Sequence, residues 1–482
     1  MTPAEFGELE AAIERMTDIA KGFGLDFYDM RFELVPADVL YTFGAYQGMP
    51  TRFSHWSFGK AYHRMKMDYD FGLSRIYELV INSDPCYAFL MDSNSLVQNK
   101  LVSAHVLAHC DFFKNNAMFA RTSRGVVDSM AASAERFRSY EMEYGKDAVE
   151  EFLDAALAVQ EHVDASHTSL RRQLKRSEKD GETQRQLSRE RGPYEDLFEL
   201  DIRSADAARA AEKGQQSDEP ASGKRAIQTE KDLLLFLVHH SKVLSDWQRD
   251  ILTVVREEML YFWPQIETKI MNEGWATYWH LRIMRELPLT DADSLDFARM
   301  HSGVVLPSKT SVNPYTLGLK MWEEIEKRWD RMRSEADSAA NVAPSGREKM
   351  FEVREMESDT SFIRNYLTKE LVDELDLYLY QKVGNEWRVV EQDFEKVRDK
   401  LCASRVNGGY PVLLVRDGDY QLTGELYLFH AYEGMELDVR YTEKTLPYVH
   451  RLWGRSVHLE TVLEGRPVLF TYDGKKTSRK FL

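Results

Sequence analysis

Helix-type spacing of apolar residues dominates this chain up to about residue 385 and limits its fold more than any other feature. The first such segment, residues 3–23, starts after Thr2, a good helix cap, and has Pro3 in its first turn. Similar patterns cover residues 56–80, 96–120, 126–165, 231–286 and 315–335. Because strand-like alternation is scarce here, we predict a large, mainly α-helical domain over residues 1–385.

The pattern changes near residue 386, where short β-branched and aromatic runs follow one another. Asp-Gly pairs at 417–418 and 473–474 indicate turns. The stretch PYVHRLWGRS (447–456) indicates a helix between strands. We therefore predict a small α+β domain over residues 386–482.

Residues 168–230 differ in composition from both predicted domains. The stretch LRRQLKRSEKDGETQRQLSRERG is charged, rich in Gln and Ser, and free of aromatic residues. Such a composition cannot bury enough apolar surface to offset the chain entropy that is lost on ordering. We predict a disordered charged insertion within the helical domain, the alternative being a segment that binds a partner.

Charge and composition narrow the classes of protein that fit this chain. The formal net charge of −16 disfavours non-specific binding to nucleic acid or anionic lipid. No window approaches the roughly 18 apolar residues of a membrane span, and the N-terminus lacks the pattern of a signal peptide. The three cysteines form no CxxC motif and are too few for a disulfide framework. We expect a cytoplasmic protein that neither spans a membrane nor binds nucleic acid.

Two histidines one helical turn apart form the first part of a candidate metal site. His105 and His109 lie at positions i and i+4, so both imidazoles of a helix over this stretch face the same side. This is the geometry with which a helix presents two ligands to a zinc ion. The apolar neighbours Val106, Leu107 and Ala108 leave a second interpretation open, in which the pair belongs to a helical core.

A distant carboxylate is the candidate third ligand. Glu273 lies in the otherwise uncharged stretch NEGWATYWH, residues 272–280. An unpaired buried charge is costly, so this carboxylate needs a metal ion, an arginine or a protonated histidine as its partner. A buried ion pair between helices is the structural alternative.

The segments HVLAH and NEGWATY together resemble the two-helix signature of the gluzincin metallopeptidases. The resemblance implies that His105, His109 and Glu273 are zinc ligands. The glutamate that acts as the general base in those enzymes is replaced here by Val106, and a valine cannot accept a proton. Hydrolase-like chemistry therefore requires a base from elsewhere in the chain.

Long motifs along most of the chain resemble the stage V sporulation protein R (SpoVR) family. They include FSHWSFGKAY (53–62), IYELVINSDPCYAFLMDSNS (76–95), AHVLAHCDFFKNN (104–116), REEMLYFWPQIETKIMNEGWATYWH (256–280), NPYTLG (313–318) and the tail around RDGDYQLTGELYLFH (416–430). The resemblance implies a separate C-terminal domain and a link to sporulation, through spore cortex formation, or to stress physiology. It also implies two partners, a serine kinase and a von Willebrand-A-like protein.

The candidates for the general base are Glu258, His280 and His55. His55 also fits a satisfied core histidine. Asp111, two residues after His109, is a candidate acceptor for the second ring nitrogen of a ligand imidazole. Tyr278 and His301 are candidates for stabilising an oxyanion. A di-iron bundle is the competing metal centre, but the sequence lacks the Glu-x-x-His repeats that it requires.

Functions from different classes fit these features. The first is a hydrolase-like protein in which zinc or another divalent metal polarises a peptide or cell-wall-related amide. The alternative is a non-catalytic regulatory or scaffold protein that works with the serine kinase and the von Willebrand-A-like protein. A third candidate binds a peptidoglycan precursor without cleaving it. A bound zinc with an open coordination position favours an enzyme, whereas four protein ligands favour a structural site.

Overall fold

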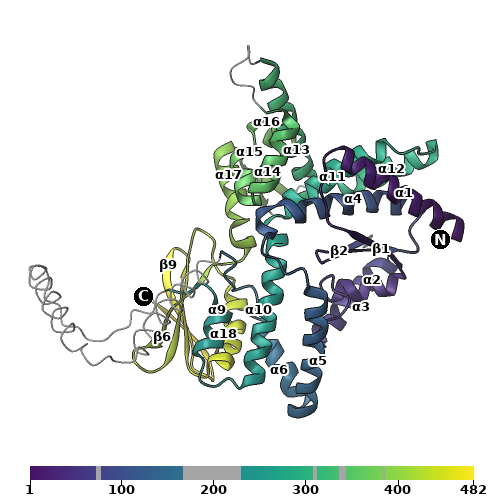
Figure 1. The fold of residues 1–482 in the computed structure, drawn as a ribbon. Helices are drawn as coiled ribbons and strands as arrows, with labels where there is room; N and C mark the ends of the chain where they lie inside the picture. The colour runs from purple at the N-terminus through teal and green to yellow at the C-terminus, as the bar shows by residue number, and fades with distance from the viewer. Residues whose placement is uncertain (72–77, 167–228, 308–311, 336–343, 384–385) are drawn as a thin grey trace, which may run out of the picture. The chain divides into compact units, whose positions relative to one another are not determined.

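The computed structural model describes residues 1–71, 78–166, 229–307, 312–335, 344–383 and 386–482 (Figure 1). The chain forms two compact units: Met1–Glu161 with Val243–Val412, and His162–Lys242 with Leu413–Leu482. The first unit is mainly α-helical and the second combines helices with a five-stranded sheet, which confirms the predicted fold class. The predicted insertion, residues 168–230, lies outside the described residues except for its last two positions.

The first unit consists of many helices and two small sheets. Its helices are α1 (Pro3–Gly22), α2 (Ala37–Ala45), α3 (Trp56–Asp70), α4 (Leu96–Asn115), α5 (Val126–Tyr144), α6 (Lys146–Leu157), α10 (Asp246–Glu267), α11 (Lys269–Arg285), α12 (Asp291–Val304), α13 (Pro314–Glu335), α14 (Gly346–Met356), α15 (Asp359–Tyr366), α16 (Lys369–Glu374) and α17 (Phe394–Ala403). Its 3-10 helices are η1 (Ala117–Phe119) and η2 (Val406–Gly409). Its strands are β1 (Met30–Val35), β2 (Glu78–Ile81), β3 (Cys86–Met91), β4 (Leu379–Val383) and β5 (Glu386–Glu391).

Helix α4 is buried over most of its length. Ser95 caps it, because the Ser95 hydroxyl accepts a hydrogen bond from the Gln98 N–H and the Gln98 side chain accepts one from the Ser95 N–H. Buried residues then follow without a break from Asn99 to Phe113. A helix that is buried around its whole circumference depends on the elements that enclose it. The two histidines of the candidate site therefore lie on an element that is packed on all sides.

Helix α11 packs against both α4 and α13 (Figure 1). The contact with α13 is close because two glycines meet there: a Cβ atom on Gly274 would lie 2.4 Å from the Cα of Gly318. Only residues without a side chain permit such an approach of two backbones. The two glycines thereby help to set the position of α11, and with it that of Glu273.

The helical pattern over residues 231–286 corresponds to three helices, and two of them, α10 and α11, meet at Thr268. Pro264 lies inside α10 without ending it. The helix ends where the N–H and the hydroxyl of Thr268 both donate to the Pro264 carbonyl oxygen, at 3.1 and 2.7 Å. The Asp359 carboxylate then accepts two backbone N–H groups in the first turn of α11 at 2.9 Å each. A residue distant in sequence therefore caps this helix.

The helical expectation over residues 56–80 is wrong at its C-terminal end, because the first unit contains a three-stranded sheet. Helix α3 ends at Asp70, and β2 begins at Glu78. The strand order is β1-β3-β2, with β1 parallel and β2 antiparallel to β3. Strand β3 is buried at five of its six positions, so its sequence CYAFLM lacks the alternation that indicates a half-exposed strand.

The second unit is built around a five-stranded sheet of order β10-β9-β8-β7-β6. Its elements are α9 (Leu233–His240), β6 (Leu413–Tyr420), β7 (Glu425–His430), α18 (Val439–Trp453), β8 (Val457–Leu463), β9 (Arg466–Tyr472) and β10 (Thr477–Phe481). Strands β7 and β8 are parallel, and the other neighbouring pairs are antiparallel. Parallel neighbours require a crossover, and α18 provides it with Leu446, Val449 and Leu452 buried. This helix overlaps the helix predicted from PYVHRLWGRS, but it begins earlier, at Val439, and ends at Trp453.

The division into two domains at residue 385 stays a prediction. The two compact units of the structure are instead separated after Glu161, Lys242 and Val412. Helix α17 follows residue 385, yet its Val397 and Cys402 are buried in the core of the first unit. Conversely, α9 precedes residue 385 and packs against β6 of the second unit. The packing of buried apolar residues therefore decides to which unit each of these helices belongs. The change in amino-acid composition near residue 386 does not decide it.

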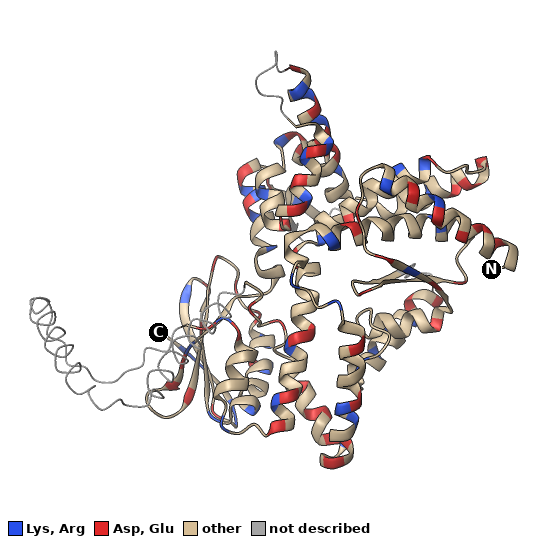
Figure 2. Cartoon of the chain, in the orientation of Figure 1, with Lys and Arg blue, Asp and Glu red and all other residues tan. Residues whose placement is uncertain are grey.

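Charged residues of both signs are interleaved along exposed helical surfaces of the first unit, as α13 and α14 illustrate (Figure 2). The excess acidic residues of the chain therefore do not form a continuous acidic patch on these two helices. Among the helices that the structure describes, none is sufficiently long and apolar to cross a lipid bilayer.

Candidate metal centre

The structure brings together the three residues that were predicted as metal ligands. His105 and His109 project from α4, and Glu273 projects from α11. One ligand atom of each residue lies within 4.8 Å of the other two. The two imidazole side chains are each 7% exposed and the Glu273 side chain is 17% exposed. Their role as metal ligands stays a prediction, but their geometry permits it.

The Glu273 carboxylate is the feature that most needs a partner. Its Oε2 atom lies 3.6 Å from Nε2 of His105 and 3.5 Å from Nε2 of His109. It is also enclosed without a hydrogen-bond partner among the described residues. Two ligands of a tetrahedral ion with bonds of about 2.0–2.2 Å are separated by roughly 3.3–3.6 Å. The two distances from Oε2 therefore fit a shared cation better than direct hydrogen bonds.

Asn272 orients one of the two imidazoles. Its Oδ1 lies 2.9 Å from Nδ1 of His109. An amide oxygen only accepts hydrogen bonds, so Nδ1 of His109 carries the proton and the lone pair is on Nε2, which faces Glu273. The sequence analysis missed this role, although Asn272 directly precedes Glu273 in the NEGWATY motif.

Electrostatics keep His109 and Glu273 in the forms that bind cations. Burial and the neighbouring His105 lower the pKa of His109 to about 4, so this imidazole is neutral at neutral pH. For Glu273, burial acts to raise the pKa, but the interactions with His105, His109 and Tyr315 outweigh it and lower the pKa below its ordinary value. An ionised carboxylate and a neutral imidazole are both competent metal ligands.

Two further residues lie around His105. Nδ1 of His280 lies 2.9 Å from Nδ1 of His105, and burial lowers the pKa of His280 well below its ordinary value. The Tyr315 ring is stacked on the His105 ring, with centroids 6.1 Å apart. The Tyr315 side chain also hydrogen-bonds Glu273. Tyr315 was not predicted as a site residue, although it lies in the NPYTLG motif at the start of α13.

Only one of the three candidate bases lies at this centre. Glu258, on α10, forms a buried ion pair with Arg52, whose Nε and Nη2 donate to Oε2 at 2.9 and 2.7 Å. His55 precedes α3 and contacts Asp154 at 3.1 Å. It is 7% exposed and has partners at both ring nitrogens, as the alternative interpretation of a satisfied core histidine expects. His280 is therefore the candidate base that the fold brings to the predicted ligands.

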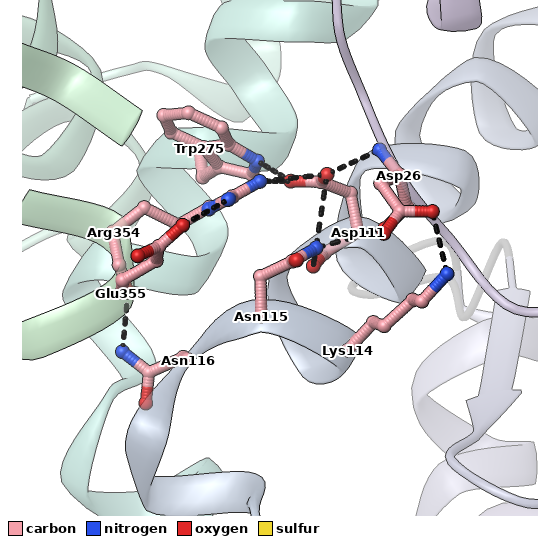
Figure 3. Close-up of polar contacts among 8 residues, drawn as sticks. All are labelled: Asp26, Asp111, Lys114, Asn115, Asn116, Trp275, Arg354 and Glu355. Carbon is pink, nitrogen blue, oxygen red and sulfur yellow. Dashed lines mark hydrogen bonds and ion pairs between the residues drawn. The ribbon is translucent and has the colours of Figure 1, made fainter. Parts of the chain in front are cut away.

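Asp111 was expected to accept a hydrogen bond from His109, but Nδ1 of His109 contacts Asn272 and Asp111 has the other partners that Figure 3 shows. Its carboxylate accepts two hydrogen bonds from Nη1 of Arg354 at 2.8 Å each. It also accepts bonds from Nε1 of Trp275 and the Asp26 N–H, both at 2.8 Å. The reason is the helical repeat. Side chains two positions apart in an α-helix point about 200° apart, so Asp111 faces away from the side that His109 occupies.

Comparison with known proteins links the chain to one family. The family model described as SpoVR like protein matches residues 4–410, and the model described as SpoVR-like C-terminal domain matches residues 411–464. The chain is also similar to the uncharacterized protein YcgB of Escherichia coli (strain K12). The two are 30% identical over 485 residues, which cover 94% of this chain and 92% of that protein. No solved structure matches.

Proposed function

The chain belongs to the SpoVR family, and from this premise we propose that it binds one divalent cation through His105, His109 and Glu273 and uses it in hydrolase-type chemistry. The observation that carries the proposal is the enclosed Oε2 atom of Glu273, which lies within 3.6 Å of two imidazole nitrogens and has no hydrogen-bond partner among the described residues. A cation between these atoms provides the partner that a buried carboxylate requires.

Zinc is the best match to these ligands. Two imidazoles and one carboxylate form a three-residue set found in catalytic zinc sites, and zinc binds nitrogen and carboxylate oxygen readily. When bound, such an ion acts as a Lewis acid on a carbonyl group. The protein's contribution is positional: α4 and α11 hold the ligands, Asn272 orients His109, and the Tyr315 side chain bonds the Glu273 carboxylate.

The proposed substrate class is a peptide or cell-wall-related amide. This choice rests on the similarity of HVLAH and NEGWATY to the gluzincin signature, and a role in spore cortex formation or stress physiology rests on the family resemblance. A base is still required. His280 is the candidate closest to the ligands, but both of its ring nitrogens contact other histidines, so it has no free nitrogen with which to accept a proton from water.

Metal analysis of the full-length protein tests the proposal. The protein should be purified without a metal-affinity step, dialysed against zinc, and assayed for bound metal and for cooperative thermal unfolding. We expect about one zinc per chain in the wild type. His105→Ala should lose the metal and still unfold cooperatively, while His63→Ala should keep it, because His63 is an exposed histidine on α3. A wild-type protein without stoichiometric zinc or another divalent metal would exclude the proposal.

A second candidate function is a non-catalytic regulatory or scaffold protein that acts with the serine kinase and the von Willebrand-A-like protein. The observation that favours it is Val106, which occupies the position of the usual base and is 0% exposed in the core. A panel of peptide and muropeptide amides distinguishes the two functions. If zinc is bound but the release of new amino groups does not exceed that of His105→Ala, the regulatory function is favoured.

A further inference from the structure

Three histidines form a continuous hydrogen-bonded chain that leads away from the candidate metal centre. Nδ1 of His105 contacts Nδ1 of His280 at 2.9 Å, and Nε2 of His280 contacts Nδ1 of His301 at 3.1 Å. His105 and His280 are buried, at 6% and 2% exposure, whereas His301 is only partly buried. The chain therefore runs from α4 through α11 to the last turn of α12.

The direction of these hydrogen bonds follows from the chemistry of neutral imidazole. A neutral ring has one nitrogen that donates and one that accepts. If Nε2 of His105 is the atom that binds a cation, its Nδ1 carries the proton and donates to Nδ1 of His280. His280 must then carry its proton on Nε2 and donate it to Nδ1 of His301. Each ring thus dictates the tautomer of the next.

We propose that His280 and His301 are positioning residues that hold His105 in the tautomer that binds metal. The proposal rests on the proposed function, because it concerns the same centre. It states that a hydrogen-bond acceptor at position 301, on α12, controls the tautomer of His105, on α4. If this acceptor is removed, the Nε2–H group of His280 has no hydrogen-bond acceptor. The tautomer of His280 with its proton on Nδ1 is then favoured, because this proton can form a hydrogen bond with His105. His280 would then donate to His105, whose proton would move to Nε2, the atom that has to bind the cation.

Helix α12 makes the proposal testable without loss of the fold. No residue of this fully described helix is buried. Substitutions on such a helix usually change stability only slightly. His301 is therefore a better probe than His280, which is almost completely enclosed and whose replacement would leave a cavity or an unsatisfied group.

The experiment compares three variants of the full-length protein. His301→Leu removes the acceptor, His301→Gln retains an acceptor in its amide oxygen, and His63→Leu is a matched control at an exposed histidine. The affinity for Zn²⁺ is measured by competition with a chromophoric chelator. The visible absorption of the Co²⁺ form is recorded at saturation, because it reports ligand geometry. Thermal unfolding of the metal-free proteins checks the fold.

We expect His301→Leu to bind Zn²⁺ about tenfold more weakly than wild type and to change the Co²⁺ spectrum, as for the loss of a group that orients a ligand. His301→Gln should recover affinity to within about threefold, and His63→Leu should match the wild type. If wild type and His301→Leu bind Zn²⁺ equally and share one Co²⁺ spectrum, the tautomer proposal is overturned while the metal site stands. If His301→Gln is as weak as His301→Leu, retention of an acceptor does not matter and the proposal is also overturned. If wild type itself binds no metal, the proposed function fails first.

Discussion

Two buried carboxylates lie at the contact between α4 and α11, and they differ in the charge of their partners. Asp111 is paired with the permanently charged Arg354 and also accepts bonds from Trp275 and the backbone. Glu273 faces two imidazoles at 3.5–3.6 Å, and its Oε2 lacks a hydrogen bond among the described residues. The first arrangement is complete within the chain. The second leaves one carboxylate oxygen without a hydrogen bond among the described residues, and the proposed cation would bind there.

The largest expected effect is on stability, at the Asp111 side of this comparison. Arg354→Met leaves a buried carboxylate without its counter-charge, which typically costs about 3–5 kcal/mol. We expect this loss in the free energy of unfolding, measured with urea. Glu355→Gln is the control, because Glu355 bonds the same arginine but its side chain is 54% exposed. Equal unfolding midpoints for Arg354→Met and wild type would mean that the pair is not a structural requirement.

The next effect is on metal binding, at the Glu273 side. Glu273→Gln keeps the shape of the side chain but removes the charge and a strong ligand. We expect the affinity for Zn²⁺, measured by competition, to fall at least about 100-fold, more than the loss of an orienting group. The metal-free protein should lose less than about 1 kcal/mol, because Glu273 has no arginine or lysine partner among the described residues and His109 is neutral at neutral pH. If Glu273→Gln instead lost much stability and kept its affinity for Zn²⁺, Glu273 would be a structural carboxylate like Asp111 and not a metal ligand.

A smaller effect should follow from Asn272, which orients His109 through a 2.9 Å contact. Asn272→Leu removes the acceptor for Nδ1–H, and the affinity for Zn²⁺ should fall about 10- to 100-fold, as is typical of such partners. Asn272→Asp keeps an acceptor and should retain more of the affinity. If the leucine and aspartate variants bind zinc equally, the Asn272 contact does not orient the ligand.

The smallest effect is the pH dependence of the metal-free protein. The folded-state pKa of His109 is about 4, below the ordinary 6.5, because burial disfavours its charged form. The unfolded chain therefore binds more protons between these pH values, and stability should fall as the pH decreases from 6.5 towards 4. Between pH 7.5 and 5.5 this histidine accounts for a loss of about 1 kcal/mol. Thermal unfolding of wild type and His109→Gln at both pH values measures it, and equal pH slopes would contradict the prediction.

The sequence alone predicted the local parts of the centre. The i and i+4 spacing puts His105 and His109 on the same side of a helix wherever that helix packs. Apolar periodicity also predicted α4 and α11 as helices, because helical hydrogen bonds join residues that are close in sequence. The predicted third ligand, Glu273, was suggested by its place in an otherwise uncharged stretch and by a resemblance to a known signature, and not by spacing.

Only the tertiary structure decided which side chains meet. Asn272 lies 163 residues after His109, and Arg354 lies 243 residues after Asp111. No local rule connects positions so far apart; their contacts arise because buried helices pack closely enough for the two glycines of α11 and α13 to touch. Helical phase already implied that Asp111 points away from His109, but its partner on α14 became evident only from the packing. The sequence thus determined the helices and their faces, whereas packing over long sequence distances decided which faces meet.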